Sequence, residues 1–171
     1  SSIRVEDMGL AFDMVSRNLY SNPIGSFVRE LVSNGVDANK DNDIATKVAV
    51  NVFKEDALWY FQVLDQGKGM SPTHFKEVYM KWFNSDKRDT NEKIGGWVLG
   101  SKSPLSYVEQ YNVITTFEEV EYYYIVARTS TVPTATLISS KPTDNPSGTI
   151  VKVEIQEKDL WELNAEMTSQ L

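Results

Sequence analysis

The sequence predicts an α+β domain in which helices cover one face of a mixed, mostly antiparallel sheet. Two helical segments come first, then a hairpin and a third helix, and the later strands follow one another with no helix between them. A doubly wound parallel sheet would alternate strand and helix along the chain, so this order argues against it. With 171 residues, the chain has the length of one domain with a sizeable core.

The helices are indicated by apolar residues at helical spacing and by residues that begin or end a helix. Ser21-Asn22-Pro23 ends the first segment, and Pro23 or Ser26 can open the second. Pro72 stands at a position that the first turn of a helix accepts. Helices are expected, in chain order, over residues 8–20, 24–39, 72–83, 101–108 and 158–170.

The strands are indicated by apolar and aromatic runs and by alternation of apolar and polar residues. Polar residues 54–56 separate two such runs and predict a hairpin turn. Residues 142–148 are rich in turn formers, and the clean alternation after them predicts the last strand. Strands are expected over residues 48–53, 58–64, 111–116, 120–127, 134–140 and 149–155.

The composition excludes several kinds of site. Seventeen basic and 24 acidic residues give a formal net charge of −7, so direct nucleic-acid binding by this domain is not expected. The absence of cysteine rules out disulfides, thiolate catalysis and cysteine-ligated zinc, and the single histidine, His74, rules out a site built from several histidines. No apolar run approaches the roughly 20 residues of a transmembrane segment, so we expect a cytoplasmic location.

The helix over 24–39 carries a first group of polar residues. Glu30, Asn34 and Asp37 fall on one narrow stripe beside the apolar face of that helix. An amide oxygen can bind Mg²⁺, and a carboxylate can orient or deprotonate a water molecule. Taken alone, such a stripe is more often a solvated helix face.

A second group stands at the end of the strand over 58–64. In Asp65-Gln66-Gly67-Lys68-Gly69-Met70, the two glycines allow the backbone to approach a ligand closely. The carboxylate of Asp65 could accept a hydrogen bond from an exocyclic amine. Alone, this pattern is more often an ordinary turn.

Two further motifs follow along the chain. Residues 95–103 form a glycine-rich loop that leads into a helix start, an arrangement that can bind phosphate, although the spacing is not that of a P-loop. Gly148-Thr149 opens the last strand and places a hydroxyl there. Each motif is weak evidence by itself, and their order along the chain is the informative feature.

That order resembles the GHKL ATPase superfamily, which includes DNA gyrase, the 90-kDa heat-shock chaperones, histidine kinases and MutL. The resemblance covers about residues 8–156 and implies the Bergerat fold, a two-layer α/β sandwich that binds ATP or ADP with Mg²⁺. By this resemblance Glu30 is the general base for the attacking water, Asn34 is the Mg²⁺ ligand, and Asp37 lines the nucleotide pocket.

The same resemblance assigns the remaining nucleotide contacts. It makes Asp65 the acceptor for the adenine amino group, with Gly67, Gly69 and Met70 near the base and Thr149 supporting that side. The residues that it places over the phosphates are Gly96, Gly100, Ser101 and Lys102, with Gly95 as a further nucleotide-binding residue and Lys87 in what would be the ATP lid.

A finer resemblance concerns residues 84–91, 94–96 and 99–107, which are similar to the rIIA-like proteins of large tailed phages. It implies that residues 1–171 are the N-terminal ATPase domain of a longer phage protein in the host cytoplasm. Further implications are a host or phage protein partner and a nucleotide-dependent dimer of the full-length protein.

Two departures from the superfamily pattern point to slow hydrolysis. Val98 stands where the phosphate loop usually has glycine, and a β-branched residue resists positive φ. We expect residues 1–171 to include no second domain that would bring a Lys or Arg to the γ-phosphate, so hydrolysis by these residues alone should be slow. We therefore expect a weak ATPase, and the alternative is a non-catalytic module that keeps the fold for nucleotide binding or protein interaction.

Overall fold

The computed structural model describes residues 22–81, 103–129 and 132–170. The expected helix over 8–20 and the glycine-rich loop lie outside the described residues. Described strands form one six-stranded sheet in the order β1-β2-β6-β3-β4-β5, and each adjacent pair is antiparallel. Their bounds are β1 (Ala49–Glu55), β2 (Leu58–Leu64), β3 (Gln110–Phe117), β4 (Val120–Thr129), β5 (Val132–Pro142) and β6 (Gly148–Ile155).

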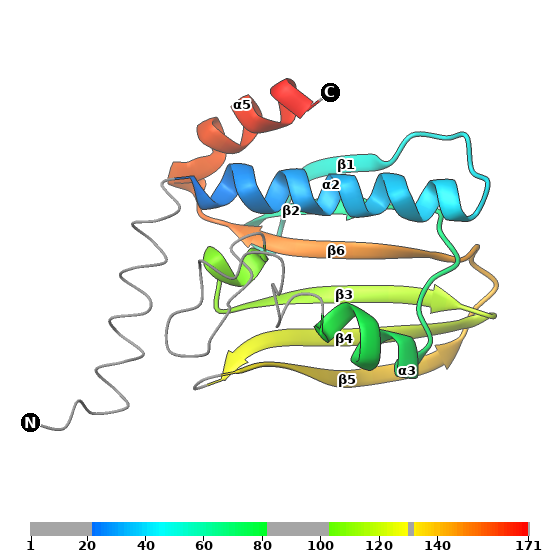
Figure 1. Ribbon diagram of the computed structural model, residues 1–171. Helices are drawn as coiled ribbons and strands as arrows, with labels where there is room; N and C mark the ends of the chain where they lie inside the picture. The colour runs from blue at the N-terminus through cyan, green and yellow to red at the C-terminus, as the bar shows by residue number, and fades with distance from the viewer. Residues whose placement is uncertain (1–21, 82–102, 130–131, 171) are drawn as a thin grey trace, which may run out of the picture.

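The helices lie on one face of this sheet (Figure 1). Helix α2 (Pro23–Asp41) runs along the direction of the strands and packs against β2, and α3 (Pro72–His74) continues into a π-helical turn, Phe75–Tyr79. A 3₁₀ turn, Glu157–Asp159, leads into α5 (Leu160–Gln170), which lies beside α2. The short helix expected over 101–108 is, in its described part, a single 3₁₀ turn, Pro104–Ser106. The α+β prediction is therefore confirmed, with antiparallel pairing throughout the described sheet.

Helix α2 begins where the sequence predicts. Asn22 caps it by accepting a hydrogen bond from the N–H of Gly25 at 2.9 Å, and Pro23 occupies the first turn. The amide nitrogen of Asn22 donates to Oε1 of Glu166 at 2.6 Å, and Arg29 pairs with Oε2 of Glu166 at 3.5 Å. These contacts tie α5 to the start of α2.

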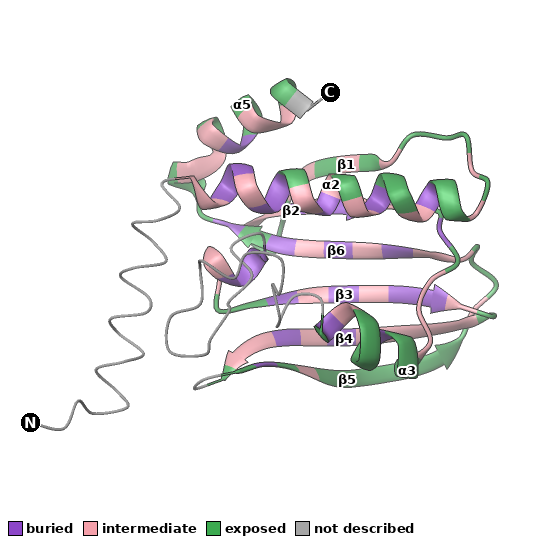
Figure 2. Cartoon of the chain, viewed as in Figure 1, coloured by how far each residue is buried: buried purple, intermediate pink, exposed green. Residues whose placement is uncertain are grey.

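The core lies between α2 and the middle of the sheet (Figure 2). Phe27 of α2 meets Phe61 of β2 edge to face, with 6.0 Å between the ring centroids, and both side chains are fully buried. Phe75 stacks on Tyr124 of β4 with a centroid separation of 3.9 Å. Because aromatic pairs of this kind bury large apolar areas, they fix α2 and the π-helical turn over the sheet.

Candidate functional site

Asp65 directly follows β2 and lies beside the start of β6. Its backbone N–H donates to the carbonyl of Thr149 at 3.0 Å. Its Oδ1 accepts hydrogen bonds from the N–H groups of Gly67 at 2.9 Å and Thr149 at 3.1 Å. Among the described residues, nothing donates to Oδ2. The carboxylate is thus held by one oxygen and can accept a further hydrogen bond through the other.

The pKa of Asp65 is raised above its usual range. Partial burial is the main cause, and the hydrogen bonds from Gly67 and Thr149 oppose it. A carboxylate in such a setting gains from a donor that satisfies its second oxygen, and an exocyclic amine of a ligand is one such donor.

The glycines after Asp65 are required by close backbone packing. Gly69 has φ +73°, and a Cβ there would overlap the carbonyl oxygen of Thr116. A Cβ on Gly67 would stand 2.8 Å from Cβ of Ala38 on α2. The turn is therefore pressed against both β3 and α2.

Thr149 belongs to a buried hydroxyl pair with Thr115, a residue that the sequence did not single out. The two Oγ1 atoms are 2.9 Å apart, and Thr115 Oγ1 also accepts the N–H of Met70 at 2.9 Å. The sequence could have pointed to Thr115 through the alternation of its strand, because Thr115 falls on the same face as the buried Tyr111 and Val113.

Asn39, near the end of α2, was also missed. Its Oδ1 accepts the N–H of Gln66 at 2.6 Å, and its Nδ2 donates to the carbonyl of Thr46 at 2.9 Å. Asn42 donates from Nδ2 to the carbonyl of Gln66 at 2.8 Å. No pattern in the sequence marks Asn39, because its burial follows only from the packing of the end of α2 against the turn after β2.

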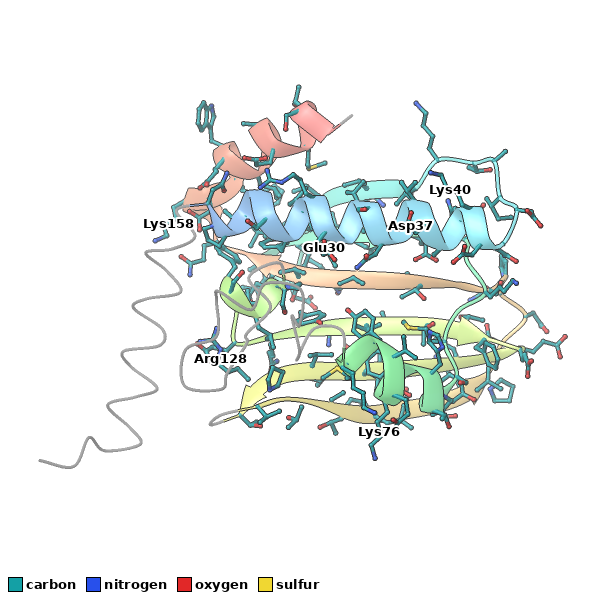
Figure 3. All side chains as sticks on the ribbon, in the orientation of Figure 1. Glu30, Asp37, Lys40, Lys76, Arg128 and Lys158 are labelled. Atoms are coloured by element: carbon teal, nitrogen blue, oxygen red, sulfur yellow. The ribbon has the colours of Figure 1, made fainter. Side chains whose placement is uncertain are left out.

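Helix α2 brings the first polar group near this turn. Figure 3 places Glu30 near the middle of α2 and Asp37 in its C-terminal half. A Cβ on Gly35, next to Asn34, would lie 3.6 Å from Cβ of Asp65. Glu30 and Asn34 are half-buried, whereas Asp37 is exposed.

Glu30 lies close to Tyr79, a half-buried residue that is paired with the buried Tyr111. The hydroxyls of Tyr79 and Tyr111 are 3.2 Å apart. Burial is the main cause that raises the pKa of Tyr79, and Tyr111 and the charge of Glu30 add to it. Glu30 thus adjoins a pair of hydrogen-bonded tyrosine hydroxyls.

The described residues therefore bring together Asp65, Gly67, Gly69, Met70 and Thr149, with α2 alongside. Lys87, Gly95, Gly96, Gly100, Ser101 and Lys102 lie outside the described residues. No group of three or more carboxylates or histidines that could hold a metal occurs in the described part of the chain. A metal bound through Asn34 would therefore have one amide oxygen from that residue and would need its other ligands from water or phosphate. None of the described helices is long and apolar enough to cross a membrane.

A cavity of about 530 Å³ opens at the same end of the sheet. It is bordered by Lys68 and by residues 117–119 and 143–147. Neither Asp65 nor the polar residues of α2 line it. We therefore place the candidate site between α2 and the turn after β2 rather than in this cavity.

An open antiparallel sheet, helices on one face and a Glu-Asn-Asp helix beside an Asp-Gly turn define a class of ATPase domain. Residues 22–160 match the family described as histidine kinase-, DNA gyrase B-, and HSP90-like ATPase, and the chain belongs to that family. The expectation of a GHKL-type ATPase domain is thereby confirmed.

One curated relative is the DNA mismatch repair protein PMS1 of Arabidopsis thaliana. It is 30% identical over 118 residues, which are 68% of this chain and 11% of the relative. The chain therefore spans about a ninth of that protein. Neither finding bears on the resemblance to phage rIIA-like proteins.

Proposed function

We propose that this domain binds ATP with Mg²⁺ and hydrolyses it slowly. The observation that carries the proposal is the Asp65 carboxylate, whose Oδ1 is held by two backbone N–H groups while Oδ2 is left for a ligand. In the proposal, Oδ2 accepts the adenine amino group. Gly67, Gly69 and Met70 would flank the base, and the N–H of Thr149 would keep Asp65 in place through its hydrogen bond to Oδ1.

The residues of α2 fit the phosphate side of this proposal. Asn34 would hold Mg²⁺ through its amide oxygen, with waters and phosphate oxygens as the other ligands, as Mg²⁺ prefers. The ion would supply neutralisation of phosphate charge. Within the described part of the chain, no hydrogen bond engages the Asn34 side-chain amide, so this amide can turn toward a ligand. Asp37, which is exposed on the same stripe of α2, would line the nucleotide pocket.

Glu30 would act as the general base. Its carboxylate would orient the attacking water and take up its proton as the water oxygen bonds to the γ-phosphorus, while the bond from that phosphorus to the oxygen of the β-phosphate breaks and ADP leaves. Its half-buried place on α2, close to the hydrogen-bonded pair of Tyr79 and Tyr111, supports this role, because neighbouring side chains can hold the carboxylate in one orientation. Lys87, Gly95, Gly96, Gly100, Ser101 and Lys102 would enclose the phosphates, and Val98 in that loop is the reason to expect slow turnover.

Calorimetric titration with ATP and Mg²⁺, together with a phosphate-release assay, tests the proposal. The wild type should bind ATP and release phosphate slowly. Glu30→Ala should keep ATP binding and lose turnover, and Asp65→Asn should lose adenine nucleotide binding. Glu154→Ala, an exposed carboxylate on β6, is the matched control and should change neither. Absence of ATP binding at millimolar nucleotide would contradict the proposal.

The resemblance of residues 84–91 and 99–107 to rIIA-like phage proteins forms a finer part of the proposal. In that setting the domain would act in a host cytoplasm, with a host or phage protein partner or a nucleotide-dependent dimer. Light scattering of the full-length protein with ADP and with a non-hydrolysable ATP analogue tests the dimer, since only the analogue should raise the mass.

A further inference from the structure

The end of α2 is fastened to the residue that follows Asp65. Both backbone polar groups of Gln66 are engaged, since its N–H donates to Asn39 at 2.6 Å and its carbonyl accepts from Asn42 at 2.8 Å. Asn39 is 3% exposed, and its second polar atom is satisfied by the carbonyl of Thr46 at 2.9 Å. This amide therefore has no freedom to flip or withdraw without leaving a buried group unpaired.

The position of Gln66 determines how Asp65 faces the site. Its N–H belongs to the peptide that leaves Asp65, and the next N–H, of Gly67, holds Asp65 Oδ1 at 2.9 Å. A shift of the turn at Gln66 would move both the Cα of Asp65 and the donor that holds its carboxylate. A hydrogen bond weakens steeply with such changes in distance and angle.

We propose that Asn39 is a positioning residue for base recognition: it fixes Gln66 and so aims Oδ2 of Asp65 at the amino group of a 6-aminopurine nucleotide. The inference rests on the proposed function, and it concerns preference among purines rather than binding itself. Asn42 assists from the carbonyl side of the same residue.

A purely structural role for Asn39 leads to a different result. If the amide only stabilised the fold, its loss would weaken every nucleotide to the same degree. If it aims Asp65, its loss should weaken ATP more than inosine triphosphate, whose 6-oxo group cannot donate to a carboxylate. The ratio of the two affinities separates the two roles.

The experiment measures the dissociation constants of ATP and inosine triphosphate by calorimetry, well below the unfolding temperature of each variant. The wild type should prefer ATP. Asn39→Ala should lower that preference by about 3- to 10-fold, the equivalent of one hydrogen bond. Asn42→Ala should lower it less and serves as the deciding variant if Asn39→Ala does not fold. Leu163→Ala, a core truncation in α5, is the control for lost stability and should keep the wild-type ratio.

The outcomes separate this inference from the proposed function. A wild-type ratio in folded Asn39→Ala, or in Asn42→Ala if the former is unfolded, would overturn the inference and leave ATP binding intact. A wild type that binds both nucleotides equally would overturn base recognition by Asp65 and the inference with it. A wild type that binds neither would refute the proposed function itself.

Discussion

The hydroxyl oxygens of Thr115 and Thr149 lie 2.9 Å apart, on neighbouring strands β3 and β6. Both residues are buried, and Thr115 also accepts the N–H of Met70 at 2.9 Å. One hydroxyl therefore joins the centre of the sheet to the far end of the turn that begins at Asp65. The turn is held at Gln66 by α2 and at Met70 by β3.

We predict that Thr115→Val destabilises the domain by about 1–3 kcal/mol, the range for buried polar groups left without a partner. Valine matches threonine in shape, so the change isolates the hydroxyl and leaves the N–H of Met70 and the hydroxyl of Thr149 unpaired. Urea unfolding measures the difference. Thr136→Val, an exposed change on β5, should stay within about 0.5 kcal/mol of wild type. Equal stability of Thr115→Val and wild type would show that the hydroxyl pair contributes nothing.

Asp65→Asn should leave the domain at least as stable as wild type at pH 7. Burial raises the folded-state pKa of Asp65 above its unfolded value of about 4, so the folded protein favours the protonated carboxyl. The contribution of Asp65 to the free energy of unfolding is fully present below pH 4 and is lost as pH rises through the raised pKa of the folded state. At pH 7 the domain with ionised Asp65 is therefore less stable than the domain with a neutral side chain there. Asparagine keeps an oxygen for the N–H groups of Gly67 and Thr149 without the charge.

Thermal unfolding between pH 3 and pH 8 measures this effect, and the Asn variant should show a flatter pH dependence than wild type. Asp65→Ala is the contrasting change, because it leaves two backbone donors unpaired and should lose about 1–3 kcal/mol. If Asp65→Asn lost as much stability as Asp65→Ala, the expected cost of the buried charge would be wrong.

Gly69→Ala should be more damaging than Gly67→Ala. At Gly69 the new Cβ would meet the backbone carbonyl of Thr116 and the residue would keep a left-handed φ, which together exceed about 2 kcal/mol. At Gly67 the Cβ would meet Cβ of Ala38 at 2.8 Å, Oδ1 of Asp65 at 3.1 Å and the carbonyl oxygen of Ala38 at 3.2 Å. These contacts are longer than the one at Gly69, a small shift of α2 can relieve them, and no left-handed φ adds strain. Calorimetric unfolding of the two variants tests the order, and the reverse order would refute it.

Local pattern was enough to predict most of the elements. The apolar stripe of α2, Pro23 at its first turn and the alternation in β6 are consequences of residues close together in sequence, and the structure confirms each element. The helix expected over 101–108 shows the limit of such patterns. Its described part is one 3₁₀ turn, because the chain must return to the sheet and begin β3 at Gln110.

The contacts that hold the candidate site depend on residues far apart in sequence. Thr115 meets Met70, and Asn39 meets Gln66, only once the sheet register and the path of α2 are fixed. The need for glycine at position 69 likewise comes from the backbone of Thr116. Sequence pattern could flag an Asp-Gly turn here, but it could not show which neighbours press against it.

Ala57→Gly should stabilise the domain by up to about 1 kcal/mol. The β1–β2 hairpin turns through Asp56 and Ala57, with φ values of 49° and 69°, the left-handed conformation of a type I′ turn. Glycine adopts this conformation without the Cβ strain that alanine carries, although its greater unfolded entropy offsets part of the gain. Ala135→Gly, in the middle of β5, is the control and should destabilise. A lower midpoint in urea for Ala57→Gly would contradict the argument.

The hydrogen-bonded pair of Tyr79 and Tyr111 should make the domain sensitive to alkali. Burial raises the folded-state pKa of Tyr79 and of Tyr111 above the unfolded value of about 10. The stability of the folded state is therefore fully present below pH 10 and is lost as pH rises toward the folded-state pKa values, because only the unfolded chain releases those protons easily.

Tyr79→Phe removes one of the two groups, so the loss of stability between pH 10 and pH 12 should be shallower. At neutral pH the same variant should be less stable by up to about 1 kcal/mol, because the hydroxyl of Tyr111 loses one of its two partners, the hydroxyl of Tyr79 at 3.2 Å, and keeps Ser103. Urea midpoints across that pH range, with tyrosinate absorbance as the readout of ionisation, test both parts. Parallel pH profiles for the two proteins would show that Tyr79 does not carry the alkaline transition.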